Sequence, residues 1–181
     1  MLRTNLTKTA CLLLPVMAFG LAGCGLTQSV TDGAKSTVTS IFYKKIKVLH
    51  LDFVAREALN TDARESNSAS QPLMIRVYQL RDRKAFDTLV YRQLLKEDET
   101  LLTGDLLARR DVVLKPGNAA ILDMPMDAAA KFVAVVGLFR QPDTEKNSWR
   151  LVLPREALDP DTARVLAADG NSLTLLSERE T

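Results

Sequence analysis

Hydrophobic and polar positions alternate in two stretches of the chain that a long polar segment separates. From Leu49, an apolar side chain occupies every second position as far as residue 53, and the same spacing runs from Leu73 to residue 77. A period of two places alternate side chains on one face of a β-strand, whereas a helix needs a period near 3.6. The pattern predicts strands over 47–55 and 73–80, each with one face turned to a hydrophobic core.

The segment between these two strands is polar and long for a strand connection. Residues 59–71, LNTDARESNSASQ, hold one large hydrophobic side chain. Hairpin loops usually have about 2–5 residues, and much longer loops tend to be mobile or functional. The charged and amide side chains here can present hydrogen bonds to a partner, with Leu59 as an apolar anchor at the base. The candidate binding residues are Leu59, Asn60, Thr61, Asp62, Ala63, Arg64, Glu65, Ser66, Asn67, Ser68, Ala69 and Ser70.

The strand rhythm breaks off after residue 80. Phe86, Leu89 and Leu94 follow at helix-like spacing, and further leucines continue to residue 107. This spacing predicts two short helices, around 88–96 and 98–104, in a small helical insertion over about 82–107. Their apolar side chains are expected to be core contacts rather than a cofactor site.

Short strands resume beyond the insertion. Gly117 and the Asp169-Gly170-Asn171 sequence are typical of tight turns, and residues 132–139 are apolar on both faces, as in a central strand. About eight short strands at close spacing predict a mainly β fold, a two-sheet β-sandwich. The strands expected after the insertion are 110–114, 119–124, 132–139, 149–153, 164–167 and 172–176.

The first 23 residues have the features of an export signal. Arg3 and Lys8 precede an uncharged apolar run over 10–21, which is shorter than the roughly 20 residues that span a bilayer. The run ends in Leu21-Ala22-Gly23-Cys24, the pattern of a bacterial lipobox. There the cysteine sulfur receives diacylglycerol, a peptidase cuts before the cysteine, and the freed amine can be acylated. The alternative is an uncleaved anchor with an incidental cysteine.

These features divide the chain into a signal peptide (1–23), a lipidated N-terminus and tether (24–45) and the sandwich domain (46–181). The tether is small and polar, with weak helical spacing over 30–45, so both a short helix and a flexible linker remain open. Gly25 follows the candidate lipid-bearing cysteine. Aspartate at that position would suggest inner-membrane retention, so glycine favours the outer membrane.

Charge and cysteine content exclude several classes of partner. The signal holds two of the 24 lysine and arginine residues and none of the 22 acidic residues, so the mature chain has 22 of each sign. A net charge near zero gives no electrostatic reason to expect nucleic-acid binding. Cys11 leaves with the signal and Cys24 carries lipid, so the body has neither a free thiol nor a disulfide. Its stability must come from packing.

Candidate chemistry is sparse. His50 is the single histidine, and although Asp52 could orient it, no nucleophile motif accompanies the pair. One histidine, no free thiol and no clustered carboxylates at ligand spacing argue against a metal site, and no glycine-rich phosphate loop is present. Trp149 is expected in the core, with Arg150 facing outward to a salt bridge or partner. The inventory favours a binding protein over an enzyme, without cofactor, metal or small-molecule substrate.

Five runs of the sequence resemble the type VI secretion lipoprotein family, known as TssJ, VasD or SciN. They cover nearly the whole mature chain in the family's order: VLHLDFVAREALN (48–60), RVYQLRDRKAF (76–86), GDLLARRDVVLKPG (104–117), FVAVVGLFRQPD (132–143) and WRLVLP (149–154). The resemblance implies a transthyretin-like sandwich with a helical insertion and a protruding loop, here residues 59–70. It also implies lipidation at Cys24.

The resemblance further implies a function. Proteins of this family sit on the periplasmic face of the outer membrane and bind the periplasmic C-terminal part of TssM, forming an envelope-spanning complex with TssM and TssL. The loop varies in length and sequence within the family, so contact residues cannot be transferred individually. A solvated loop, with the partner surface elsewhere on the sandwich, remains open. Other hypotheses are a small-ligand- or lipid-binding lipoprotein, which needs a hollow β structure, and a periplasmic hydrolase, which needs a catalytic set.

Overall fold

The computed structural model describes residues 45–177. The predicted signal peptide, Cys24 and nearly all of the tether lie outside the described residues. Among the described residues, no helix is long and apolar enough to cross a membrane.

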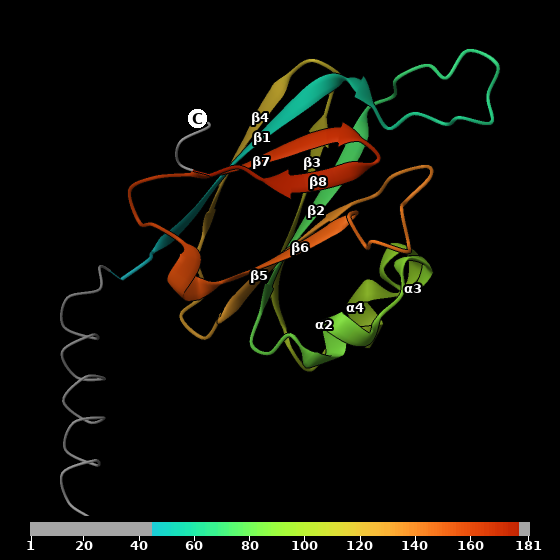
Figure 1. The fold of residues 1–181 in the computed structure, drawn as a ribbon. Coiled ribbons are helices and arrows are strands. Elements are labelled where there is room, and N and C mark those ends of the chain that lie inside the picture. The colour runs from blue at the N-terminus through green and yellow to red at the C-terminus, as the bar shows by residue number, and fades with distance from the viewer. Residues whose placement is uncertain (1–44, 178–181) are drawn as a thin grey trace, which may run out of the picture. The chain divides into compact units, whose positions relative to one another are not determined.

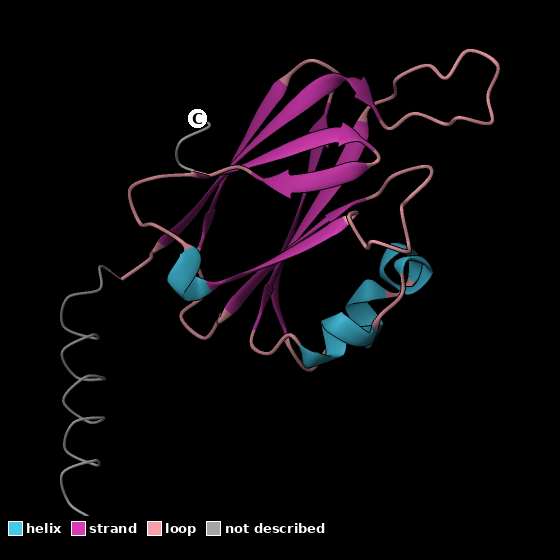
Figure 2. Ribbon diagram, in the orientation of Figure 1, coloured by secondary structure: helices cyan, strands magenta, loops and turns pink. Residues whose placement is uncertain are grey.

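The described residues form two four-stranded sheets that face each other, as predicted (Figures 1 and 2). All neighbouring strands run antiparallel except β1 and β7, which are parallel. The first sheet has the order β4 (Ala119–Pro125), β1 (Val48–Leu59), β7 (Arg164–Gly170), β8 (Ser172–Leu175). The second has the order β3 (Leu106–Leu114), β2 (Leu73–Leu80), β5 (Phe132–Gly137), β6 (Arg150–Pro154).

The core fills the space between the sheets. The alternating residues of β1 and β2 are buried as predicted: Leu51, Phe53, Leu73 and Ile75 each have 0% exposure. They belong to one hydrophobic cluster that draws on both sheets. Burying a side chain of this size contributes about 1.5–3 kcal/mol, so the fold can be stable without a disulfide.

Three strands are longer than predicted by three or more residues: β1, β3 and β7, which runs to Gly170 rather than 167. β1 continues four residues beyond 55, and its pairing with β7 shifts register between Ala55 and Leu59. Such an irregularity disrupts the alternation that marks a strand in sequence. β3 begins at Leu106 rather than 110, and its pairing with β2 shifts register in this added part, between Gln79 and Leu80. β5 lies between β2 and β6, which confirms the predicted central strand, although it ends at Gly137 rather than 139.

The helical insertion is present, with three short helices instead of two. They are α2 (Lys84–Thr88), α3 (Tyr91–Lys96) and α4 (Asp98–Leu101), and a 3₁₀ turn, η1 (Arg155–Ala157), follows β6. Helices of four to six residues are not stable alone. Phe86, Leu94 and Leu102 belong to the buried hydrophobic cluster, each with 0–1% exposure, which confirms the predicted core contacts for these side chains, whereas Leu95 is 41% exposed.

A buried ionic cluster also fixes the insertion to the second sheet. Arg76 of β2 donates from Nη1 to Asp98 Oδ2 at 3.1 Å, and the Tyr78 hydroxyl donates to the same oxygen at 2.9 Å. Arg76 also donates from Nε to Asp111 Oδ1 of β3 at 3.1 Å. Burial and the hydrogen bond to Asp98 raise the pKa of Tyr78. The insertion therefore packs against the polar face of β2.

Candidate functional site

Two loops meet at one end of the sandwich. The β1–β2 loop, residues 60–72, projects from the sheets and is drawn in green at the upper right of Figure 1. The β5–β6 loop, residues 138–149, is drawn in orange on the same side. Hydrogen bonds between residues 75–80 positions apart in the sequence connect them.

Asn60 is the hub at the base of the β1–β2 loop. Its backbone N–H donates to the Gly170 carbonyl at 2.6 Å, and its Nδ2 donates to the Pro72 carbonyl at 3.0 Å. Its Oδ1 accepts from the backbone N–H of Arg140 at 2.8 Å. Asn60 has 4% exposure and a positive φ of 50°. One buried side chain thus links both ends of this loop to the β5–β6 loop.

Asp62 accepts hydrogen bonds from within the β1–β2 loop and from the β5–β6 loop. Its carboxylate accepts from Arg64 Nε at 3.1 Å, from Arg64 Nη2 at 3.0 Å and from Gln141 Nε2 at 2.6 Å. The hydrogen bonds from the Arg64 side chain and backbone hold the pKa of Asp62 below its ordinary value. This stabilisation is present above the ordinary pKa of an aspartate and is lost as the pH falls through the lowered value. Asp62 is therefore committed to internal contacts.

An ion pair joins the tip of the loop to the β5–β6 loop. Both guanidinium Nη atoms of Arg140 donate to the carboxylate of Glu65. A hydrogen bond from Asn171 Nδ2 to the Thr61 carbonyl, at 3.0 Å, adds a tie to the β7–β8 turn. A loop held by so many contacts loses less conformational freedom on binding than a mobile loop would.

The candidate residues therefore fall into two groups. Leu59 is not a loop residue: it ends β1 and is fully buried. Asn60 and Asp62 are also buried, and Thr61, Ala69 and Ser70 are half-buried. The exposed residues form one continuous tip, which consists of Ala63, Arg64, Glu65, Ser66, Asn67 and Ser68.

The β5–β6 loop is the part of the surface that the sequence did not reveal. Arg140 and Gln141 follow a buried strand, and in sequence they read only as the start of a polar turn. Their partners Glu65 and Asp62 lie 75 and 79 residues earlier. Only the packing of the two sheets brings them together.

The His50–Asp52 pairing that the sequence allowed is not formed. His50 Nδ1 lies 2.6 Å from Asp123 Oδ1, on the neighbouring strand β4, rather than being oriented by Asp52. The two residues face each other in the β1–β4 register, and both are partly exposed. Over residues 45–177, no group of three or more histidine, cysteine or acidic residues is placed to hold a metal ion.

Replacing Asn60 with alanine tests how much the hydrogen bonds of its side-chain amide stabilise the protein. We expect the free energy of unfolding to fall by about 1–3 kcal/mol, because the Arg140 N–H and the Pro72 carbonyl lose their partner. Asn60→Gly is the matched control, since glycine adopts a positive φ freely but also lacks the amide. Urea denaturation measures both. A loss below about 0.5 kcal/mol in both variants would contradict the role of the amide.

The fold and this surface together define a class of protein, a β-sandwich scaffold that displays a preorganised polar loop. The sequence profile of the type VI secretion lipoprotein family, described by the names VasD, EvfM, TssJ and VC_A0113, matches residues 47–171. The chain belongs to this family. It is a type VI secretion lipoprotein, as the sequence runs predicted. A comparison with curated proteins finds no match.

Solved structures agree with this assignment. A chain in the structure described as "Type VI membrane complex" is 47% identical, with a TM-score of 0.69, over 74% of this chain and 100% of that one. A chain in "T6SS protein TssM C-terminal domain (869-1107) from EAEC" is 46% identical, with a TM-score of 0.64, over 73% and 99%. The lipoprotein TssJ1 from Pseudomonas aeruginosa, 22% identical with a TM-score of 0.60 over 73% and 96%, shares the fold.

Proposed function

We propose that this lipoprotein is anchored in the outer membrane, faces the periplasm and binds the periplasmic C-terminal region of TssM. By doing so it helps to assemble the type VI secretion membrane complex, together with TssL. The observation that carries the proposal is the 46–47% identity to chains from structures described as a TssM C-terminal domain and a type VI membrane complex. Those chains are matched over almost their full length.

The geometry of β1 supports a two-ended role. The strand has 12 residues, so its ends lie about 35–40 Å apart. Ile46 lies two residues before the first residue of β1, and its carbonyl accepts a hydrogen bond from Arg155 Nη2 at 3.0 Å. This contact fixes the chain where the tether joins the sandwich. The β1–β2 loop leaves the opposite end. The loop therefore lies far from the point where the chain enters the sandwich.

The second attachment point of the protein is the lipid. We propose that Cys24 carries diacylglycerol and an N-acyl chain. One acyl chain gives only marginal membrane binding, whereas two or more signals anchor stably, at about 0.8 kcal/mol per buried CH₂. Gly25 in the next position favours the outer membrane as the destination.

The two-loop surface is our candidate for the TssM contact. Replacing residues 63–67 with five glycines removes five of the six side chains of the exposed tip and leaves the buried Asn60 and Asp62 in place. We expect the affinity for the TssM periplasmic domain to fall at least tenfold in calorimetric titration, because a flexible tip must be ordered on binding. The thermal unfolding midpoint should change by only a few degrees.

The control for this experiment is Glu156→Gly, an exposed position in η1 beyond the opposite end of the sandwich. Its affinity should equal that of the unmodified protein. Unchanged affinity in the glycine-tip variant would move the interface to another surface of the sandwich. Failure of the unmodified protein to bind TssM would overturn the proposed function itself.

The structure offers no support for the second hypothesis, a ligand held inside a hollow sandwich. The inward side chains of both sheets form one buried cluster, with exposures of 0–8%. A binding role for the interior would require displacing these side chains.

A further inference from the structure

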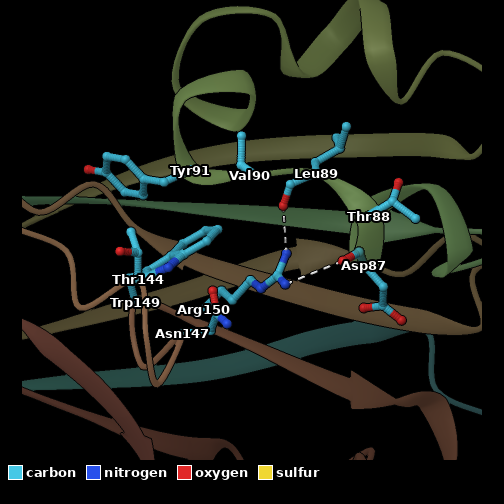
Figure 3. Close-up of a pocket in the computed structure, with 9 residues that line it drawn as sticks. All are labelled: Asp87, Thr88, Leu89, Val90, Tyr91, Thr144, Asn147, Trp149 and Arg150. Atoms are coloured by element: carbon cyan, nitrogen blue, oxygen red, sulfur yellow. Dashed lines mark hydrogen bonds between the residues drawn. The ribbon is translucent and has the colours of Figure 1, made fainter.

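A small pocket lies between the helical insertion and the β5–β6 loop, outside the core (Figure 3). Its volume is about 280 Å³, enough for one side chain or a small organic molecule but below the range of most drug-sized sites. Leu89, Val90 and Tyr91 line it from the insertion, and Thr144, Trp149 and Arg150 line it from the other side. Val90 is 60% exposed, so an apolar wall of the pocket is open to solvent.

Trp149 brings an unused hydrogen-bond donor to this pocket. The residue has 1% exposure, and its Nε1–H has no acceptor among the described residues. Figure 3 shows the nitrogen-bearing edge of the indole turned toward Thr144, another wall residue. Tyr91 stands edge-on to the indole at 5.1 Å, and its hydroxyl is committed to the Phe139 carbonyl. The nitrogen is itself buried, so an acceptor in the pocket reaches it only when a wall residue such as Thr144 moves aside. Because buried donors are nearly always satisfied, this N–H favours a ligand acceptor that binds with such a movement.

Arg150 brings a positive charge to the same place. The sequence predicted that it faces outward, but it is half-buried under the insertion, with its guanidinium over the Trp149 ring at 4.9 Å. It donates to the Leu89 carbonyl at 3.0 Å and to the Phe86 and Asp87 carbonyls at 3.3 Å. These acceptors are neutral, and within residues 45–177 no carboxylate forms an ion pair with Arg150.

The acidic wall residue does not cancel this charge. Asp87 also lines the pocket, but its carboxylate accepts from Arg83 Nε at 2.6 Å and from Nη2 at 3.1 Å. The charges of Asp87 and Arg83 largely cancel each other, so the positive charge of Arg150 is left without an opposite partner. Burial lowers the pKa of Arg150, although a guanidinium keeps its proton at neutral pH.

We propose that this pocket binds a carboxylate group, which accepts the Trp149 Nε1–H and lies in the field of Arg150, while its aliphatic stem packs against Leu89 and Val90. Charge-assisted hydrogen bonds of this kind are shorter and stronger than neutral ones. The carboxylate can come from a free organic acid or from an acidic side chain of a protein partner. Both sources present the same chemistry to the pocket.

The chain contains a single tryptophan, so its indole N–H resonance in a ¹H–¹⁵N spectrum reports on this pocket alone. The full-length protein is titrated with sodium butanoate and, as the matched neutral probe, butanamide. We expect butanoate to move the resonance downfield in a saturable way and butanamide to leave it in place. No saturable shift, or equal shifts from both probes, would overturn the proposal.

Exchanging an exposed wall residue tests the charge. Val90→Glu should weaken butanoate binding at least tenfold, and Val90→Lys should strengthen it, because the two variants change the local charge in opposite directions. Val113→Glu, a similarly exposed valine on the edge strand β3, is the control and should bind as the unmodified protein does. Equal effects of Val90→Glu and Val90→Lys would contradict a carboxylate site.

A last arm identifies the source of the carboxylate. Capped tripeptides Ala-Glu-Ala and Ala-Gln-Ala are titrated in the same way. A glutamate peptide that saturates at a concentration at least tenfold lower than butanoate assigns the site to a protein partner. A stronger response to butanoate assigns it to a free acid.

Discussion

Replacing Asp98 with alanine is expected to lower the free energy of unfolding by about 3–5 kcal/mol, as is typical when one partner of a buried ion pair is removed. Asp98 and Arg76 have side-chain exposures of 8% and 9%. Without the carboxylate, the Arg76 guanidinium stays buried with one of its two acidic partners missing, and the Tyr78 hydroxyl loses its acceptor. Urea denaturation with far-ultraviolet circular dichroism measures the loss.

Glu99→Ala is the matched control for this experiment. Glu99 is the next residue in α4, its side chain is 71% exposed, and it pairs with Arg109 on the surface. Exposed pairs contribute about 0–1 kcal/mol, so the control should lose no more than that. A second variant, Arg76→Met with Asp98→Leu, should recover part of the lost stability, because it leaves no buried charge unpaired, although the Tyr78 hydroxyl still lacks its acceptor. Equal losses in the Asp98 and Glu99 variants would contradict a buried cluster.

The same cluster marks the limit of what the sequence could predict about the fold. The period of two found β1 and β2 because each buries one face in the core. It also indicated that Arg76 and Tyr78 lie on the opposite face of β2, but not that this face is covered. The insertion covers it through Asp98, which in the sequence is one of several acidic residues in a helical stretch. Burial of a charged residue depends on contacts that no local pattern encodes.

The candidate site divides in a similar way. The β1–β2 loop was identifiable, because length and polarity set residues 60–70 apart from the flanking strands. Which loop residues are exposed was not, since Asp62 looks as available as Glu65 in the sequence and is buried under Arg64 and Gln141. Arg150 shows the same error. Strand alternation correctly set it opposite the core, yet the helical insertion covers that face of β6 as well.

Cys24→Ser is expected to remove the protein from the outer-membrane fraction and to abolish effector secretion. The serine hydroxyl cannot form the thioether to diacylglycerol, and the peptidase that requires the lipidated cysteine then has no substrate. Without acyl chains, the favourable transfer of about 0.8 kcal/mol per CH₂ into the bilayer is lost. Even with an intact TssM-binding surface, the protein could not connect the two membranes.

The chain supplies its own control for this experiment. Cys11→Ser changes the other cysteine, which lies inside the predicted signal and should leave membrane fractionation and secretion unchanged. Mass spectrometry of the purified protein distinguishes the two views of the first 23 residues, because a processed lipoprotein begins at Cys24 and carries acyl mass. If the Cys24→Ser protein stays in the outer membrane and supports normal secretion, the lipid is not the anchor. If it stays membrane-bound with residues 1–23 attached but secretion fails, retention comes from an uncleaved signal, and the proposed role of the lipid in secretion is preserved.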